Sequence, residues 1–212
     1  MKKIFALCIA VLLMGVPPLA HAEPLEPEAL IRNTVDEVMA IVKQDKDIQA
    51  GNQRKILALV DAKVLPHFNF TRMTRLTVGK HWRVATPEQR QALETEFRNL
   101  LVRTYTKAFT VYRDQKVEIK PLKMERDATE VTIKSSIIKP GTPSVPVDYD
   151  MEKTADGWKV YDVYIEGVSL VTSYRSTFSE QIQQSGIEGL IKTLVEKNKI
   201  AANASLRQAE PK

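Results

Sequence analysis

The hydrophobic period of this sequence changes twice, and the two changes restrict the folds that the chain can adopt. Between residues 28 and 112, apolar residues recur every three or four positions, which is typical of helices. Between residues 117 and 165 they alternate with polar residues, which is typical of strands. Helical spacing returns after Gly167. This order predicts an α+β fold in which a layer of helices covers a twisted, mainly antiparallel sheet of four strands.

The helix boundaries carry their own signals. The sequence TPEQ at residues 86–89 is the clearest helix start, because Thr86 can cap the helix, Pro87 suits its first position and Gln89 can complete a capping box. The helix that follows can run for about 25 residues, which is longer than average. A break is expected at residues 185–186, before a last helix. The helical segments predicted ahead of TPEQ are residues 28–44, 53–65 and 70–78.

Turn sequences separate the predicted strands. KPGTPS at residues 139–144 and TADG at residues 154–157 make the last three strands an antiparallel meander. Strict alternation in the last strand places Tyr161, Val163 and Ile165 on one face, and Val160 with Asp162 on the other. Both faces would then be rich in apolar or aromatic residues, unlike an antiparallel strand with one face in water.

The junction between this strand and the next helical pattern is short. Only Glu166 and Gly167 separate them, and Gly167 can take backbone angles that other residues resist. The chain can therefore bend sharply and carry Val168, Leu170 and Val171 across the end of the sheet. Two apolar surfaces then meet. They either pack as ordinary core or hold a ligand between them, and composition alone leaves both interpretations open.

The first residues predict export from the cytoplasm. Lys2 and Lys3 precede an apolar run, and the sequence AHA at residues 20–22 offers the small residues that signal peptidase requires. Residues 1–22 are therefore interpreted as a signal peptide. The single cysteine, Cys8, lies within it, so the remaining chain has no disulfide and depends on its core alone.

The remaining chain suits one domain. We assign residues 23–199 to a single α+β domain and residues 200–212 to a flexible C-terminal tail. Without Lys2 and Lys3, 29 Lys and Arg residues face 26 acidic residues. The resulting net charge near +3 is too small to indicate a nucleic-acid partner.

Residues 23–212 contain no recognisable catalytic constellation. Their two histidines, His67 and His81, lack metal-ligand spacing to another His, Cys or carboxylate pair. Ser169 and Ser173 lack a nucleophile-elbow pattern, and no glycine-rich phosphate loop is present. No metal or cofactor is therefore predicted. One catalytic alternative stays open, in which Asp162 is a buried base in the cone-shaped cavity of an isomerase or hydrolase.

Three segments resemble one known family. They are VDAKVLPHFNFTRMTRLTVGKHWRVATPEQRQALETEFRNLLVRTY, GWKVYDVYIEGVSLVTSYRSTF and SGIEGLIKTL, and they are similar to MlaC, the phospholipid-binding component of the Mla system, also called the Ttg2 toluene-tolerance family. The resemblance implies a non-enzymatic carrier in the periplasm of a Gram-negative cell. Such a carrier moves phospholipid between an outer-membrane lipoprotein–porin complex and the MCE-domain protein of an inner-membrane ABC transporter, and so maintains outer-membrane lipid asymmetry.

The resemblance also implies a deep apolar pocket between the sheet and the helices, with the lipid headgroup left at the surface. Burying a dozen methylenes contributes on the order of 10 kcal/mol, which suits transport through water. Two acyl chains require a pocket near the upper end of the usual range, about 1,000 Å³. We expect a monomer that needs no nucleophile, metal or cofactor.

The expected pocket residues follow from the shared faces of the predicted elements. They are Leu65, Leu76, Leu101, Tyr105, Val147, Tyr149, Val163, Ile165, Val168, Leu170, Val171 and Tyr174. A second set of residues clusters around the third helical segment and can attract anionic lipid headgroups or acidic docking surfaces; it is Arg72, Arg75, Lys80 and Arg83. The alternative interpretation of this second set is a solvated basic face.

Two other functions remain possible at the level of the sequence. One is the small-molecule isomerase or hydrolase with Asp162 as its base. The other is a periplasmic chaperone or adaptor whose apolar groove binds protein rather than lipid.

Overall fold

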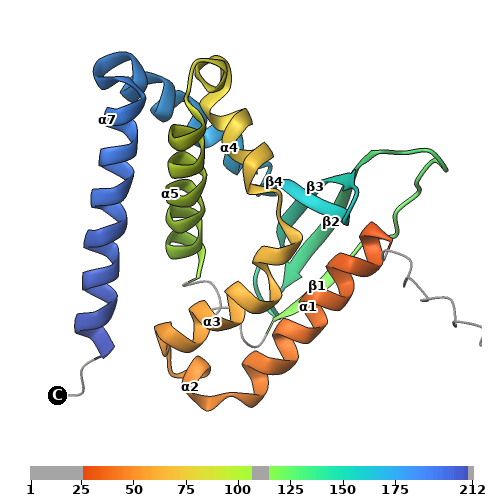
Figure 1. Cartoon of the computed structure of the whole chain (residues 1–212). Helices are drawn as coiled ribbons and strands as arrows, with labels where there is room; N and C mark the ends of the chain where they lie inside the picture. Colours follow the sequence, from red (N-terminus) through yellow and green to blue (C-terminus); the bar gives the residue numbers. More distant parts are fainter. Residues whose placement is uncertain (1–25, 107–114, 210–212) are drawn as a thin grey trace, which may run out of the picture.

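A computed structural model describes residues 26–106 and 115–209, and within them a helical hairpin and a pair of long helices lie beside a sheet (Figure 1). The predicted signal peptide falls outside the described residues. The helical elements are α1 (Pro27–Gln44), α2 (Lys46–Gln49), α3 (Gln53–Lys63), η1 (Leu65–His67), α4 (Phe70–Val78), η2 (Gly79–Arg83), α5 (Pro87–Tyr105) and α7 (Leu170–Ala209). The strands are β1 (Lys116–Ile119), β2 (Glu130–Ile138), β3 (Val145–Thr154), β4 (Gly157–Ile165) and β5 (Val168–Ser169).

The sheet of the described residues is antiparallel, with the order β1-β2-β3-β4-β5. It has one strand more than predicted, because Val168 and Ser169 pair with Ile165 and Tyr164 before helix α7 begins. Glu166 and Gly167, with φ values of 52° and 80°, form the two-residue turn between β4 and β5. Positive φ at both positions is the geometry of a type I′ hairpin.

Strand β4 carries an extra residue relative to β3. Asp150 lies opposite Asp162, whereas the next residue, Met151, lies opposite Val160, so Tyr161 is the additional residue of a β-bulge. The bulge corrects the strict alternation assumed from the sequence. Val160 joins Val163 on one face of the sheet, and the apolar residues of β4 are therefore concentrated on that face.

Two predicted helix signals are confirmed. Thr86 and Gln89 form the capping box, in which the Gln89 N–H donates to the Thr86 hydroxyl at 3.2 Å and the Thr86 N–H donates to the Gln89 amide oxygen at 3.0 Å. The break near residue 186 is present as well, because Gly186 has non-helical angles of φ 72° and ψ 177° inside α7.

One predicted helix end differs in the structure, and another lies outside the described residues. Helix α5 has 19 described residues, and the further turns predicted for it fall on residues 107–114, which lie outside the described residues. Helix α7 continues past the assigned domain end to Ala209, so residues 200–209 of the assigned tail are helical.

The main core lies where α4, α5 and α7 meet the sheet. Phe97 of α5 is fully buried, and its ring centroid lies 5.4 Å from that of Tyr174 and 5.3 Å from that of Phe178, both in α7. Further along α7, the Asn198 amide donates to the backbone carbonyl of Glu96 at 2.9 Å. Helices α5 and α7 therefore form one layer, in which they run side by side (Figure 1).

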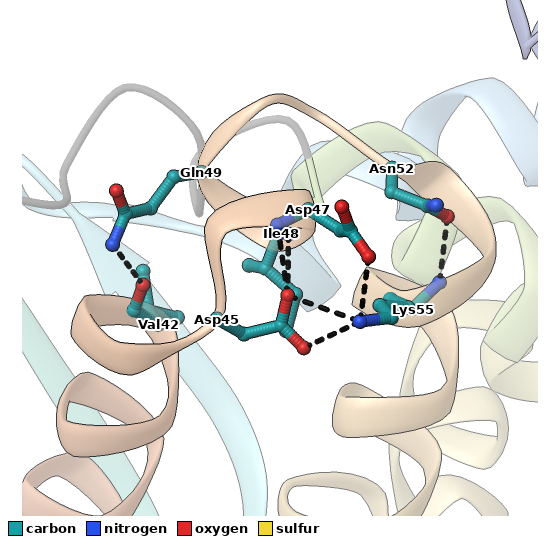
Figure 2. A network of polar contacts seen from close by, with 7 residues as sticks. All are labelled: Val42, Asp45, Asp47, Ile48, Gln49, Asn52 and Lys55. Atoms are coloured by element: carbon teal, nitrogen blue, oxygen red, sulfur yellow. Dashed lines mark hydrogen bonds and ion pairs between the residues drawn. The ribbon is translucent and has the colours of Figure 1, made fainter.

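Helices α1, α2 and α3 form a hairpin whose tip is fixed by polar contacts (Figure 2). The Lys55 ammonium lies 2.9 Å from the Asp45 carboxylate and 2.8 Å from that of Asp47. Asp45 also caps α2 by accepting from the N–H groups of Asp47 and Ile48, and the Lys55 contact is the main reason that the pKa of Asp45 is lowered. A small apolar cluster behind this tip contains Val38, Val42, Ile48, Ile56 and Leu59.

The β4–β5 turn gives a first prediction. Gly167→Ala should lower the free energy of unfolding by about 1–2 kcal/mol, because an L side chain resists positive φ even where no neighbouring atom obstructs it. Urea denaturation measures the change. Glu166→Gly, which removes the side chain from the other positive-φ position, is the matched variant and should stay within about 1 kcal/mol of wild type. Equal losses in both variants would contradict this account of the turn.

Candidate functional site

A cavity of about 540 Å³ lies between one face of the sheet and the helices α1, α3 and α5. Its wall is almost entirely apolar. The helical side contributes Ile31, Thr34, Val35, Val38, Met39, Val42, Val60, Val64, Leu65, His67, Phe68, Phe70, Met73, Leu101, Val102, Tyr105 and Thr106. The sheet side contributes Gln115, Val117, Ile137, Val145, Val147, Tyr149, Val160, Val163 and Ile165, and Leu170 completes the wall at the start of α7.

Strand register explains why the sheet side is apolar. Val147 lies opposite Ile165, Tyr149 opposite Val163, and Val145 opposite Ile137 across the neighbouring strands. Directly paired residues of an antiparallel sheet point to the same face. The alternating apolar residues of three strands therefore form one continuous surface on which the cavity lies.

The structure brings eight of the twelve predicted pocket residues to the cavity wall. They are Leu65, Leu101, Tyr105, Val147, Tyr149, Val163, Ile165 and Leu170. They come from η1, α5, the sheet and the first turn of α7, so the predicted faces of these elements meet at one cavity.

The other four residues lie elsewhere, for reasons of local geometry. Val168 is 59% exposed, because the residue that alternates with it in β5, Ser169, takes the buried position. Val171 and Tyr174 belong to the side of α7 that packs in the main core, where Tyr174 contacts Phe97. Leu76 is on α4 and packs against the same core.

Helix α1 is the largest contribution that the sequence analysis missed. Six of its residues line the cavity, among them Val35, Val38 and Val42. The apolar stripe of this helix is visible in the sequence. Its spacing is the same for a helix that packs on core and for one that faces a cavity, so periodicity could not separate the two.

The cavity wall is uncharged at neutral pH. Burial raises the pKa of the Tyr105 and Tyr149 hydroxyls, so both phenols stay protonated. Burial is also the largest of the effects that lower the pKa of His67, followed by the nearby Lys159 ammonium, whereas Glu37 acts in the opposite direction. The described lining residues include no Lys, Arg, Asp or Glu.

Asp162 forms hydrogen bonds with residues at the start of α7 and is not part of the cavity wall. It is 5% exposed, and its carboxylate accepts from the Ser169 hydroxyl, from the Val163 N–H at 2.8 Å and from the Val171 N–H at 3.1 Å. Burial raises the pKa of Asp162, and these hydrogen bonds oppose that shift. Its oxygens therefore cap a helix, which contradicts the suggested role of a base facing a substrate.

One predicted docking residue is engaged within the protein. Arg72 has a side chain that is only 16% exposed; it pairs with Glu130 at 2.6 Å and with Glu152 at 2.5 Å. Its guanidinium also lies 3.6 Å from the centre of the Tyr161 ring. Arg72 thus ties α4 to three strands. The other three, Arg75, Lys80 and Arg83, are exposed.

The described residues contain neither a candidate membrane span nor a candidate metal site. No helix among residues 26–106 and 115–209 is long and apolar enough to cross a membrane. In the same part of the chain, no group of His, Cys, Asp and Glu residues is arranged to hold a metal ion.

Fold and site together define an α+β binding protein with an internal apolar cavity. Comparison with known families identifies it further, because the model of the MlaC protein family matches residues 32–196. The chain belongs to the MlaC family. The catalytic alternative is thereby excluded, since this is a family of non-enzymatic phospholipid carriers.

Individual relatives agree with this assignment. The chain is 25% identical over 175 residues to the toluene tolerance protein ttg2D of Pseudomonas putida, covering 82% of this chain and 81% of the relative. It is 23% identical over 194 residues to the intermembrane phospholipid transport system binding protein MlaC of Haemophilus influenzae, covering 90% and 91%.

A solved structure confirms the fold. The phospholipid-binding protein of Ralstonia solanacearum, determined in complex with a phospholipid, superimposes with a TM-score of 0.78 and is 38% identical. The match covers 84% of this chain and 99% of the Ralstonia chain.

The role of Asp162 gives a second prediction. Asp162→Ala should lower the free energy of unfolding by about 1–3 kcal/mol, because the buried N–H of Val171 and its neighbours lose their acceptor. Asp156→Ala, in the exposed β3–β4 turn, is the control and should have a small effect. Chemical denaturation of both variants measures the difference. A similar small loss in both would show that the Asp162 contacts contribute little to stability.

Proposed function

We propose that this protein is a phospholipid carrier that holds acyl chains in the apolar cavity and moves them through the aqueous periplasm. The observation that carries the proposal is the uncharged cavity wall shared by the sheet and helices α1, α3 and α5. Membership of the MlaC family and the phospholipid bound to the Ralstonia relative support it. The site residues that we assign to acyl-chain contact are the eight predicted residues of the wall together with those of α1.

The energetics suit a carrier. Each methylene that leaves water contributes about 0.8 kcal/mol, so an acyl chain gains on the order of 10 kcal/mol by entering the cavity. A neutral wall adds no penalty for burying charge. Transport of this kind requires no covalent step, which agrees with the structural role of Asp162.

The cavity is smaller than the sequence-based expectation for two acyl chains. Its volume of about 540 Å³ lies within the usual range of ligand pockets, about 300–1,000 Å³, but below the upper end. Polar contacts at two places join the α1–α3 hairpin to other elements: Glu28 accepts from the Leu122 N–H at 2.8 Å, and Asp61 pairs with Arg98 of α5 at 2.7 Å. We propose that a second chain is accommodated only when this hairpin moves outward, which would break both contacts.

We also propose the partners that the family resemblance implies. They are an outer-membrane lipoprotein–porin complex and the MCE-domain protein of an inner-membrane ABC transporter, reached from the periplasm. Arg75, Lys80 and Arg83 are the docking residues of this proposal, because they are exposed around the α4–η2 corner. Arg72 is removed from the set, since two carboxylates already neutralise it.

Copurifying lipid tests the proposed function. Native mass spectrometry and solvent extraction of protein purified from bacteria should find diacyl phospholipid at about one per chain. Met39→Glu introduces a charge into the cavity wall while keeping a good helix former, and should lower the occupancy by about tenfold or more. The control is Val84→Glu, at a position that is 75% exposed. Empty wild-type protein, copurifying peptide or an unchanged Met39→Glu occupancy would overturn the proposal.

The docking proposal has a separate test. The triple change Arg75→Glu, Lys80→Glu and Arg83→Glu should slow lipid delivery to the purified MCE-domain partner and remove most of its dependence on ionic strength, because charged surfaces accelerate association. The control triple, Lys192→Glu, Lys197→Glu and Lys199→Glu, makes the same change in net charge at exposed positions of α7. Equal slowing in both triples would show that only net charge matters.

A further inference from the structure

The neutral wall leaves open where the charged part of a phospholipid lies. A phosphate needs cationic or N–H donors, and among the described lining residues His67 is the only side chain that can become cationic near neutral pH. His67 is half-buried, and its neighbour in η1, Pro66, is exposed. His67 therefore lies at an edge where the cavity approaches the protein surface.

A second basic group adjoins this edge. The Lys159 ammonium, which comes from β4, donates to the backbone carbonyl of Pro66 at 2.7 Å. That bond uses one of the three N–H donors of an ammonium group. The next residue of the strand, Val160, is fully buried in the cavity wall. By alternation the Lys159 side chain leaves the strand on the face opposite to Val160, and its ammonium reaches the edge of the cavity at Pro66.

The position of both groups is fixed by the backbone. The Asn69 N–H donates to the Val160 carbonyl at 2.8 Å, and Phe68 pairs with Val160 as an isolated parallel bridge. The segment that follows η1 is therefore attached directly to β4. His67 and Lys159 come from segments more than ninety residues apart, yet the Lys159 ammonium is held against the backbone of the residue that precedes His67.

The acidic residues around this edge are already engaged. Glu37 of α1 faces His67 but pairs with Lys63 of α3 at 2.5 Å. Glu152 of β3 lies opposite Lys159 in the strand register, but its carboxylate accepts from Arg72 at 2.5 Å and from Asn69 at 2.8 Å. The charge of Lys159 is therefore available to an incoming anion.

We propose that His67 and Lys159 bind the phosphate of the carried phospholipid, at the edge of the cavity where the acyl chains enter. This inference rests on the proposed carrier function and assigns it a headgroup site. Lys159 provides a permanent positive charge, and His67 provides a donor that becomes cationic once an anion lies beside it. Lipid binding is then coupled to the uptake of a proton by His67.

Histidine NMR tests the site directly. In lipid-free protein the His67 titration midpoint should lie below the ordinary value of about 6.5, because burial and Lys159 disfavour the cation. Loading with phosphatidylglycerol should raise it, whereas diacylglycerol with the same acyl chains should not. His81→Gln removes the other histidine signal of the domain. An unchanged midpoint in protein that has bound phosphatidylglycerol would overturn the headgroup site while leaving the carrier function intact.

Inorganic phosphate separates a lipid headgroup site from a general anion site. At concentrations where phosphatidylglycerol saturates the protein, phosphate alone should leave the His67 titration unchanged, because it lacks the acyl chains that supply most of the binding free energy. An equal response to phosphate would overturn the assignment to a headgroup. Failure of every lipid to bind would instead overturn the proposed function itself.

Variants give an independent measurement. His67→Ala with Lys159→Gln should weaken binding of phosphatidylglycerol by about tenfold and leave diacylglycerol binding within about twofold of wild type. His67→Arg should restore most of the phosphatidylglycerol affinity, which a merely structural role of His67 would not allow. The control is Lys192→Gln, at an exposed position of α7. Equal losses for both lipids in the double variant would contradict the proposal.

Discussion

The structure depends on keeping an apolar cavity open inside a folded domain, which is costly. Cavities in mutant protein cores lower stability by about 24 cal/mol per Å³, so an enclosed, empty cavity of 540 Å³ would cost on the order of 10 kcal/mol; because this cavity is partly open to the surface, that figure is an upper limit. That is comparable with the whole net stability of a typical domain, about 5–15 kcal/mol. Under the proposed function, a bound acyl chain would replace this empty volume with contacts. Cargo and fold would then stabilise each other, and the walls must be held apart by contacts made elsewhere.

Those contacts are polar and lie around the cavity rather than in it. Lys55 fixes the tip of the α1–α3 hairpin, Arg72 ties α4 to the sheet, and Asp162 holds the start of α7 against β4. Exposed ion pairs are individually weak, but a buried carboxylate that caps a helix contributes more. These polar contacts can therefore hold the elements around the cavity in place while its centre stays free of side chains.

Much of this arrangement could be predicted from the sequence, because local signals determine it. The capping box at Thr86 and the break at Gly186 are where the sequence places them. The bulge at Tyr161 was not predictable, because the extra residue is defined by the pairing of β4 with β3. The sequence of β4 alone contains no signal for it. The cavity-facing side of α1 was missed for a related reason: its partner across the cavity is distant in sequence.

The firm attachment of α5 to α7 sets this side of the cavity apart from the side formed by α1. Leu101 of α5 lines the cavity, and one turn earlier Phe97 is locked between the rings of Tyr174 and Phe178. A shift of α5 would displace α7, whereas α1 divides its buried residues: Leu30 and Ile31 belong to the main core, and Val38 and Val42 to the small cluster of the hairpin. If the hairpin moves outward as proposed, the outer surface of α1 would differ between full and empty carriers, while the α7 surface stays constant. A receptor that binds α1 could then distinguish the full carrier from the empty one, whereas a receptor that binds α7 could not.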